Sequence, residues 1–378
     1  MVRRNLLALP ALLALAPALS QAPATYFPPP GEAWEHRSPA AVDLDSAALV
    51  HAVAYAVTHE TSAPRELDRM LAERFRGPWD EIVGPVKPRG DPSGLVLRQG
   101  YIVAEWGDTR RVDMTFSVTK SFVATAAGLA FDRGLIRDLR HRVADYVTDG
   151  GFDSPHNAKI TWHHLLQQTS EWEGRLFGKP DSADRRRGVE RALREPGTFW
   201  EYNDVRVNRA ALALLQVWRR GLPDVVREHV MDPIGASDTW EWHGYRNSRV
   251  EVDGRAIESV SGGGHWGGGL WISARDLARF GYLHLRRGRW GDRQLLSERW
   301  IDRALSPSEQ HPVYGYMWWL NTDRGMWPSA PARSFAALGA GTNVVWVDPD
   351  HDLVVVLRWI EGRAVDETLR RVLAAVRD

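Results

Sequence analysis

Ser117 and Lys120 lie three residues apart, and together they could supply a nucleophile and its base. Residues with this spacing share one face of a helix, so the lysine amine would lie beside the serine hydroxyl. A hydroxyl is a weak nucleophile until a neighbouring base removes its proton. The pattern Ser-x-x-Lys is typical of enzymes that transfer acyl groups through a serine. The spacing therefore predicts Ser117 as nucleophile and Lys120 as its general base.

The flanking sequence favours a neutral Lys120 amine, which a base requires. Residues 121–131 contain no charged side chain, and a helix that is apolar on all sides is a buried helix. Burial and the positive N-terminal end of a helix both disfavour an ammonium group. Lys120 is also one of only four lysines in a chain with 44 arginines. We expect an uncharged amine within bonding reach of Ser117, at the buried start of a helix.

The composition limits the classes of partner. The chain has 378 residues, of which 44% are apolar and 25% charged, and its net charge is zero. These values are ordinary for a soluble globular protein of one or two domains, and they favour neither nucleic acid nor an anionic membrane. Without cysteine there is no disulfide and no thiolate metal site. We expect a small-molecule substrate and neither metal nor cofactor.

The first residues read as an export signal. Arg3 and Arg4 precede an apolar stretch, residues 6–19, and Ala18-Leu19-Ser20 is a small-x-small cleavage site. The stretch is short for a membrane span and contains two prolines. Residues 1–20 are therefore predicted to be a signal peptide and 21–42 an extended linker. We expect an exported protein, periplasmic or secreted, with no membrane span in its mature chain.

The elements that must position the reactive residues follow from apolar spacing, capping residues and turns. We expect helices over residues 45–59, 160–168, 208–218, 273–285 and 365–376, and strands over 95–106, 343–347 and 353–358. Strands near both ends of the chain, with helices between them, indicate one discontinuous sheet domain formed by residues 43–135 and 255–378. Residues 136–254 would form a helical domain inserted into it.

Several segments match one family in order. They are Phe116-Ser-Val-Thr-Lys-Ser-Phe, Ile160-Thr-Trp-His-His-Leu-Leu-Gln-Gln-Thr-Ser, Trp200-Glu-Tyr-Asn-Asp, Gly267-Gly-Gly-Leu-Trp-Ile-Ser-Ala-Arg-Asp-Leu-Ala-Arg-Phe and Gly339-Ala-Gly-Thr-Asn-Val-Val-Trp-Val-Asp-Pro-Asp. With these motifs the chain resembles the serine β-lactamase and penicillin-binding superfamily, closest to its class C-like branch. The resemblance covers residues 45–378. It implies a mixed α/β (α+β) fold with an antiparallel sheet flanked by helices, an inserted all-α domain, and an active site in the cleft between them.

The resemblance also implies roles for individual residues. Tyr202 is in the place of the family's Tyr-x-Asn motif, where the tyrosine shuttles the proton between nucleophile and leaving group. Aligned in this way, the backbone N–H groups of Ser117 and Ala337 would form the oxyanion hole. The residues expected to contact the substrate are Asn203, Asp204, Trp266 and Gly339.

Two departures from the family change the expected substrate. Asp204 is where the family has asparagine, and an ionised carboxylate can only accept hydrogen bonds. Either Asn203 or Asn208 supplies the missing amide, or Asp204 selects an amine-bearing substrate. The family's Lys-Thr-Gly or His-x-Gly motif is also missing before Gly339, and Arg333 is the nearest cation. Substrates that present a carboxylate therefore become less probable.

We accordingly expect a hydrolase of esters or small amides. A β-lactamase, a D-Ala-D-Ala carboxypeptidase and a penicillin-recognising sensor without turnover stay open as alternatives. The glycine-rich run 262–269 lacks the lysine and the serine or threonine of a phosphate loop. We expect instead that its glycines let the backbone approach the cleft, with His265 or Trp266 as a lining residue. Adjacent histidines, His163 and His164, point in different directions on a helix and do not predict a metal site.

Overall fold

The fold is built on a six-stranded antiparallel sheet to which both ends of the chain contribute. The computed structural model describes residues 25–377 except 32, 75–76, 186–187 and 189, so the predicted signal peptide lies outside the described residues. In sheet order the strands are β11 (Trp319–Leu320), β12 (Phe335–Gly339), β13 (Asn343–Asp348), β14 (Leu353–Arg358), β1 (Ser93–Arg98) and β2 (Tyr101–Trp106). The mixed α/β fold expected from the sequence is confirmed.

Helices cover both faces of this sheet. All six residues of β13 and of β14 are buried, which explains why these strands are nearly continuous apolar runs. Helices α1 (Ser46–Thr58) and α9 (Val365–Leu373) pack on one face, against Val355 and Leu357. Helix α7 (Ala274–Leu285) packs on the other, against Val354 and Val356.

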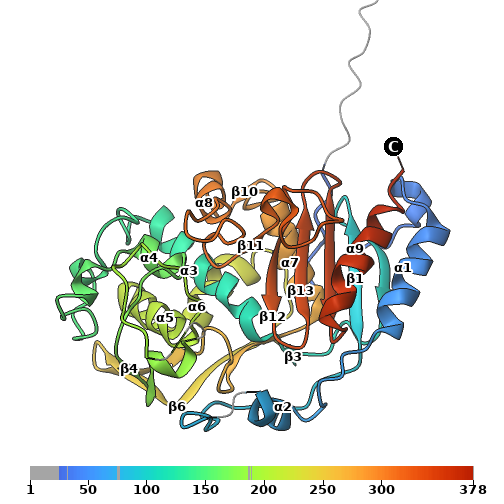
Figure 1. The fold of residues 1–378 in the computed structure, drawn as a ribbon. Helices are drawn as coiled ribbons and strands as arrows, with labels where there is room; N and C mark the ends of the chain where they lie inside the picture. The colour runs from blue at the N-terminus through green and yellow to red at the C-terminus, as the bar shows by residue number, and fades with distance from the viewer. Residues whose placement is uncertain (1–24, 32, 75–76, 186–187, 189, 378) are drawn as a thin grey trace, which may run out of the picture.

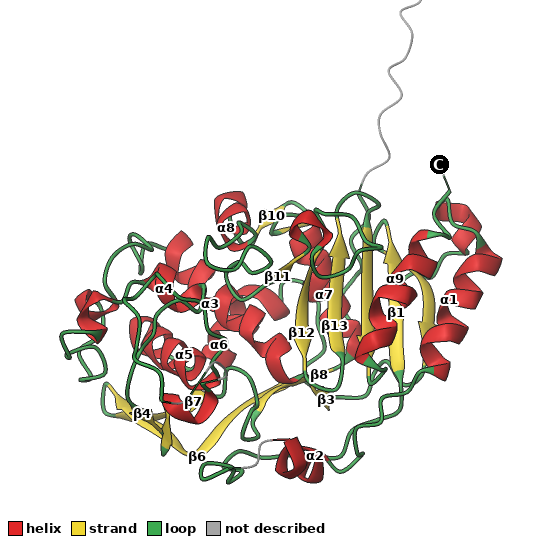
Figure 2. Cartoon of the chain, viewed as in Figure 1, coloured by secondary structure: helices red, strands yellow, loops and turns green. Residues whose placement is uncertain are grey.

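The part of the molecule beside the six-stranded sheet is built around a buried helix. Residues 119–130 of α3 (Thr119–Asp132) are all buried, as the uncharged sequence predicts. Helices α4 (Trp162–Leu166), α5 (Asp204–Trp218) and α6 (Leu222–Val226) gather around it, as Figure 2 shows. Helix α5 begins four residues earlier than expected because the side chain of Asn203 accepts a hydrogen bond from the Arg206 amide and caps it.

The middle of the chain is not all helical, which corrects the expectation for residues 136–254. The long strand β6 (Glu241–Val252) forms a second antiparallel sheet, in the order β3-β8-β6-β7. Its partners are β3 (Asp113–Met114), β7 (Arg255–Val260) and β8 (Gly269–Ile272). The smaller elements are α2 (Leu67–Arg74), α8 (Glu298–Ala304), β4 (Arg175–Leu176), β5 (Lys179–Pro180), β9 (Arg289–Trp290) and β10 (Arg293–Gln294).

The described part of the predicted linker, residues 25–31 and 33–42, lies against the body of the protein and ends in a 3-10 helix, Pro39–Val42. The buried guanidinium of Arg279, on α7, donates to the backbone carbonyls of Pro29, Gly31 and Ile234 at 2.8 Å each. One side chain thus ties the N-terminal segment to the sheet domain. Among the described residues, no helix is long and apolar enough to cross a membrane.

Candidate active site

Ser117 lies at a sharp turn where a short 3-10 helix (Phe116–Val118) leads into α3. The residue before it, Phe116, has a φ of 51°, a left-handed conformation that costs a bulky residue about 1–2 kcal/mol. The ring of Phe116 is buried against Trp359, which helps to hold this turn. The turn leaves Ser117 half-buried while its neighbours on both sides are buried.

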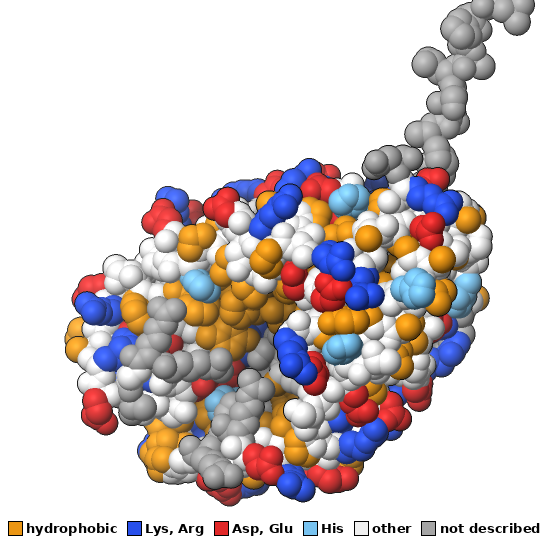
Figure 3. All heavy atoms as spheres, turned by 45° about the vertical axis from the view of Figure 1, so that its right-hand side comes forward, with side chains coloured by type: hydrophobic (Ala, Val, Ile, Leu, Met, Phe, Trp, Pro, Cys, Tyr) orange, Lys and Arg blue, Asp and Glu red, His pale blue; other side chains and the backbone are white. Residues whose placement is uncertain are grey.

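Ser117 opens into a cleft of about 910 Å³ between the two halves of the molecule. The face in Figure 3 is hollowed between its halves, with hydrophobic side chains gathered along the hollow. Four indole rings line the cleft, those of Trp79, Trp200, Trp266 and Trp319. Trp266 therefore lies where the sequence predicts.

Lys120 lies beside the nucleophile. Its Nζ is 2.9 Å from the Oγ of Ser117, so the geometry expected from the Ser-x-x-Lys spacing is present. The same Nζ is 2.6 Å from Oδ1 of Asp204, and the two side chains are only 1% and 3% exposed. The sequence did not predict that Asp204 would contact the lysine.

This contact bears on the expectation of an uncharged amine, because it places a carboxylate beside the nitrogen. The start of α3 disfavours an ammonium by about 0.3–1 kcal/mol. A carboxylate at about 4 Å favours it by about 4 kcal/mol, even at an effective dielectric constant of about 20. At 2.6 Å the carboxylate of Asp204 outweighs the helix end, whereas the burial of both side chains opposes a charge on either group. The charge of Lys120 therefore stays a prediction.

Tyr202 presents the face of its ring to the same amine. The Nζ of Lys120 lies 4.6 Å from the ring centroid, within the range of a cation–π contact. The ring stacks on Trp319 with centroids 5.7 Å apart and meets Tyr314 edge-on at 6.2 Å. Tyr202 also lines the cleft. The structure thus brings Ser117, Lys120 and Tyr202 together, as the sequence predicts.

Two further polar side chains, those of Asp184 and His265, meet Asp204 behind the ion pair. Asp184 accepts a hydrogen bond from the backbone N–H of Asp204 at 2.6 Å, and its Oδ1 lies 3.4 Å from Nδ1 of His265. One ligand atom from each of these three side chains lies within 4.8 Å of the others, a spacing that could hold a metal ion. However, a cation there would compete with Lys120 for Asp204. We assign no metal to this cluster, and its absence stays a prediction.

The second oxyanion donor is not where the sequence places it. Ala337 is buried in the core and pairs with Val345 of β13, whereas residues 338–340 line the cleft. The Asn321 amide donates to the Ser334 carbonyl, so Ser334 and, by alternation, Leu338 direct their peptide groups away from β13. The structure therefore favours residues 338–340 over Ala337 as partner of the Ser117 amide.

Gly339 brings this strand close to the nucleophile. A Cβ atom on Gly339 would lie 3.2 Å from the backbone nitrogen of Ser117 and closer than 3.0 Å to the carbonyl of Thr115. Only a residue without a side chain allows β12 and the turn at Ser117 to approach this closely. Gly339 lines the cleft, as expected, but its observed role is this close packing of backbone.

Neither asparagine replaces the amide that Asp204 lacks. Asn203 is fully buried, caps α5 and donates to the carbonyl of Asp181 at 2.9 Å, so the expectation that it contacts substrate is wrong. Asn208 donates to the hydroxyl of Tyr245 and accepts from the amide of Gly262. Both side chains therefore stabilise the fold around the cleft.

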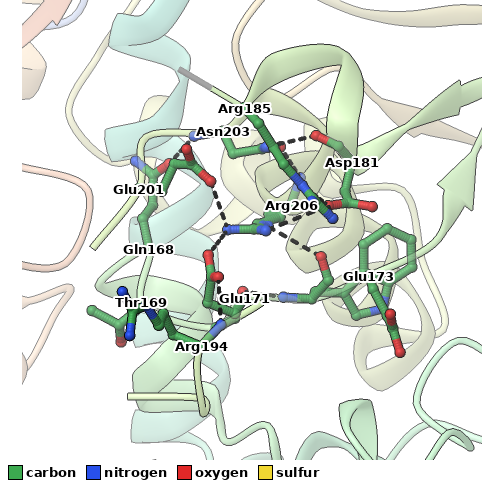
Figure 4. A network of polar contacts seen from close by, with 12 residues as sticks. Gln168, Thr169, Glu171, Glu173, Asp181, Arg185, Arg194, Glu201, Asn203 and Arg206 are labelled. Carbon is green, nitrogen blue, oxygen red and sulfur yellow. Dashed lines mark hydrogen bonds and ion pairs between the residues drawn. The ribbon is translucent and has the colours of Figure 1, made fainter. Parts of the chain in front are cut away.

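A buried ionic network holds the segment that contains Tyr202 (Figure 4). Arg206 donates to Glu171 at 2.5 Å and lies 3.4 Å from both Glu201 and Asp181. Burial raises the pKa of Glu171, but the hydrogen bond from Arg191 and the charge of Arg206 lower it to about 2. Glu201 and Asn203, on either side of Tyr202, are thus fixed to the elements behind them. These network residues come from four separate segments and were missed in the sequence.

Arg333 does not replace the missing basic residue of the third motif. Its guanidinium lies 3.1 Å from Asp350, the side chain is 77% exposed, and it does not line the cleft. Of the described charged residues that line the cleft, Arg185 is the one cation, and its Nε donates to Asp181 at 2.8 Å. The cleft therefore offers a substrate carboxylate little compensation for its charge.

Comparison with known proteins agrees with this geometry. A family model described as Beta-lactamase matches residues 100–371. The chain is 24% identical over 304 residues to the 6-aminohexanoate-dimer hydrolase of Paenarthrobacter ureafaciens, an alignment that covers 69% of this chain and 70% of that protein.

Two solved structures illustrate the shared fold. A penicillin-binding protein homologue from Caulobacter crescentus superposes with a TM-score of 0.57 at 16% identity, covering 82% of this chain and 96% of the other. A family VIII carboxylesterase superposes with a TM-score of 0.54 at 18% identity, covering 83% of this chain and 97% of the other. At these identities the likeness establishes the fold and leaves the substrate open.

Proposed function

Because the chain is a serine hydrolase of the beta-lactamase family, we propose that it hydrolyses esters or small amides through an acyl-serine formed on Ser117. The observation that supports this assignment is the hydrogen bond of 2.9 Å between Lys120 Nζ and Ser117 Oγ at the wall of an open cleft. A nucleophile within bonding reach of a titratable group, which a third group orients, is the arrangement that covalent catalysis requires.

The reaction would proceed in two halves. The oxygen of Ser117 attacks the carbonyl carbon while its proton passes to the pair formed by Lys120 and Tyr202. The resulting oxyanion accepts hydrogen bonds from the backbone N–H of Ser117 and from a backbone N–H within residues 338–340. The carbon–oxygen or carbon–nitrogen bond then breaks, and the same proton goes to the leaving group. A water molecule then attacks the acyl-serine through the same proton transfers, which frees Ser117 and releases the acid.

The charge of the cleft favours substrates without a carboxylate. Its described lining includes the acids Asp80 and Asp184 against Arg185, and two further acids, Glu201 and Asp204, that pair with Arg191 and Lys120. A β-lactam or a D-Ala-D-Ala peptide would place its carboxylate in this field, where like charges repel. We therefore rank esters and small amides above both.

An amide or ester that contains an amine is a second candidate. Asp184 lines the cleft beside His265, and both side chains are buried, so a cationic group bound there would be poorly screened by solvent. The relative from Paenarthrobacter ureafaciens is named for a substrate that contains 6-aminohexanoate. The acidic cleft and that name together support an amine-bearing substrate for this chain.

We further propose that the protein is exported, either to the periplasm or to the medium. The support is the sequence of residues 1–20, with its two arginines, apolar stretch and small-x-small site. Expression of the full chain in a bacterial host, followed by N-terminal sequencing of extracellular and periplasmic fractions, tests this. A mature N-terminus near residue 21 supports export, and an intact chain confined to the cytoplasm contradicts it.

Labelling and turnover with one serine variant test the hydrolase assignment. We expect a fluorophosphonate to label the protein and p-nitrophenyl esters to be hydrolysed, and Ser117→Ala to abolish both, with a loss in kcat on the order of 10³-fold or more. Ser121→Ala is the matched control, because that hydroxyl donates to the Met317 carbonyl and points away from the cleft. Stable labelling by a fluorescent penicillin without turnover would instead support a sensor, and nitrocefin hydrolysis as fast as the best ester would support a β-lactamase.

A further inference from the structure

We propose that Arg358 and Trp359 are positioning residues that fix the distance between the two backbone N–H donors of the oxyanion hole. These donors are the amide of Ser117 and an amide within residues 338–340, and they belong to segments that lie far apart in the chain. The inference rests on the proposed acyl-serine mechanism, and it assigns the part of the core that holds the two segments together.

The side chain of Arg358 joins these segments from inside the core. Arg358 is the last residue of β14, and it is buried. Its Nη2 donates at 2.9 Å to the carbonyl of Met114, which lies on β3 just before the turn at Ser117. Its Nη1 donates to the Ile272 carbonyl at 2.5 Å, and its Nε donates to Oδ1 of Asn343 at 2.8 Å. Because a guanidinium is planar and its donors point in fixed directions, Arg358 sets the relative positions of all three acceptors.

Asn343 extends this constraint to the wall of the cleft. It is the first residue of β13, it is buried, and its Nδ2 donates to the carbonyl of Ala340 at 2.8 Å. The bond from Arg358 and the bond to Ala340 agree on the orientation of the amide, since a guanidinium only donates and a carbonyl only accepts. Ala340 lines the cleft in the turn between β12 and β13. The path of the backbone at residues 338–340 is therefore fixed by Arg358 through one amide side chain.

The indole of Trp359 packs against the same two segments. Its ring meets the ring of Phe116, the residue before Ser117, edge-on at 87°, with centroids 6.5 Å apart. It also packs against Gly341, where a Cβ atom would lie 2.2 Å from the indole. The indole therefore limits how closely the turn at Ser117 and the turn after β12 can approach each other.

Both aromatic residues at this contact have a left-handed backbone. The φ angle is 61° at Trp359 and 51° at Phe116, values that are unfavourable for bulky residues and persist only where the surroundings enforce them. The surroundings of Trp359 do so, because its Nε1 donates to Oδ2 of Asp113 at 2.9 Å. Asp113 in turn accepts from the Gly90 amide and from Nε of Arg111, each at 3.0 Å. Strain of this kind beside a nucleophile points to a role in positioning it.

The inference predicts a loss that is specific to the oxyanion. A variant that loosens the spacing of the two donors should stabilise the developing charge less while it binds the substrate as before, so kcat falls and KM changes little. Replacing the carbonyl oxygen of the substrate with sulfur, a weak hydrogen-bond acceptor, removes most of the gain from the donors. The ratio of kcat/KM for an ester to that for its thionoester therefore measures the oxyanion hole. A loss of folded enzyme lowers both rates equally and leaves this ratio unchanged.

Trp359→Phe is the first test, because it keeps a ring near Phe116 but removes the N–H bound to Asp113 and part of the contact with Gly341. We expect kcat for p-nitrophenyl hexanoate to fall about tenfold or more, a part of the 10²–10³-fold that loss of a whole oxyanion donor costs, and the ester-to-thionoester ratio to fall with it. Trp346→Phe is the matched control, since Trp346 is equally buried but packs among residues of α1 and α9. An unchanged ratio in Trp359→Phe, or an equal fall in Trp346→Phe, would overturn the inference.

Asn343→Asp is a second variant of the same shape. It keeps an acceptor for Arg358 but places a carboxylate oxygen against the carbonyl of Ala340, where the two oxygens repel each other. We expect the ester-to-thionoester ratio to fall here too. Asn157→Asp is its control, because the buried Asn157 also donates to backbone carbonyls but does not line the cleft. If Trp359→Phe does not fold, Asn343→Asp decides the question alone, and a ratio equal to that of the natural enzyme would overturn the inference.

The two proposals can fail separately. Crystal structures of the natural protein and of both variants give the separation between the Ser117 nitrogen and the backbone nitrogens of residues 338–340 without any need for turnover. We expect this separation to change by about 0.5 Å or more in the variants, which exceeds what a catalytic site tolerates. If the natural protein hydrolyses no ester or amide, the proposed function fails while the separation still tests Arg358 and Trp359. If turnover occurs but the ratio and the separation are unchanged, the function stands and the role of Arg358 and Trp359 is refuted.

Discussion

The backbone of Gly263 packs directly against the amine nitrogen of Lys120, with no room for a side chain between them. A Cβ atom at residue 263 would lie closer than 3.0 Å to Nζ and to the carboxylate of Asp204. The glycine run 262–269 therefore has at least one member whose role is to close the cleft around an ion pair. This agrees with the expectation that the run lets backbone approach the cleft.

Gly263→Ala should therefore damage catalysis more than folding. The new methyl group must displace Lys120 or Asp204, and a shift of about 1 Å at a reacting group can cost about 10²-fold in rate. We expect kcat/KM for a p-nitrophenyl ester to fall at least tenfold, with a change in Tm of a few degrees. Gly221→Ala is the control, because its nearest neighbour would be 3.4 Å away. Equal activity of the two variants would show that Lys120 and Asp204 tolerate displacement.

Arg206→Met tests the network behind Tyr202. The substitution removes Arg206 from Glu171 and Glu201, whose side chains are 0% exposed and which also pair with Arg191. Removing one partner of a buried ion pair costs about 3–5 kcal/mol. We expect chemical denaturation to show a loss of that order, whereas Arg69→Ala, which breaks an exposed pair with Glu73, should cost less than about 1 kcal/mol. A small loss for Arg206→Met would mean that the network adds little to stability.

The same network predicts how stability depends on pH. Burial raises the pKa of Glu171, but the hydrogen bond from Arg191 and the charge of Arg206 bring it down to about 2. A carboxyl group whose pKa is lower in the folded state stabilises the fold above its unfolded pKa of about 4.3, and this contribution is lost as pH falls to about 2. The free energy of unfolding should therefore fall by about 2 kcal/mol from this residue over that range. Glu171→Gln should show a flatter dependence there, and identical slopes would contradict the assignment.

The sequence predicts the sheet and most helix starts because each rests on local chemistry. Asp45, Thr161 and Ser273 cap their helices through bonds to nearby amides, and capping needs only a few adjacent residues. The missed strands of the second sheet also have a local signal. Asp253 and Gly254 form the turn between β6 and β7, and Asp-Gly between alternating apolar residues is a strong hairpin signal.

The site was predicted where one motif fixes the geometry and missed where distant segments meet. Ser117 and Lys120 share a helical turn, so their contact follows from spacing. The contact between Lys120 and Asp204 joins residues 84 positions apart, and no local pattern encodes it. Ala337 was misplaced for a related reason. An alignment of this strand that is shifted by one residue fits the composition equally well, but neighbouring residues direct their backbone N–H groups to opposite edges of the strand.

The charge of the cleft predicts an order among matched substrates. We compare p-nitrophenyl esters of 6-aminohexanoate, hexanoate and adipate, which are of similar length and present a positive, a neutral and a negative end. The acidic lining, with Asp184 and His265 buried beside it, should favour the amine in kcat/KM over the carboxylate by at least about tenfold, or about 1.4 kcal/mol. Asp184→Asn keeps an acceptor for the Asp204 amide but removes one charge, so it should reduce this preference severalfold. Asp149→Asn, which removes a carboxylate outside the cleft, should leave the preference unchanged, and a natural enzyme that prefers the adipate ester would show that the lining does not select by charge.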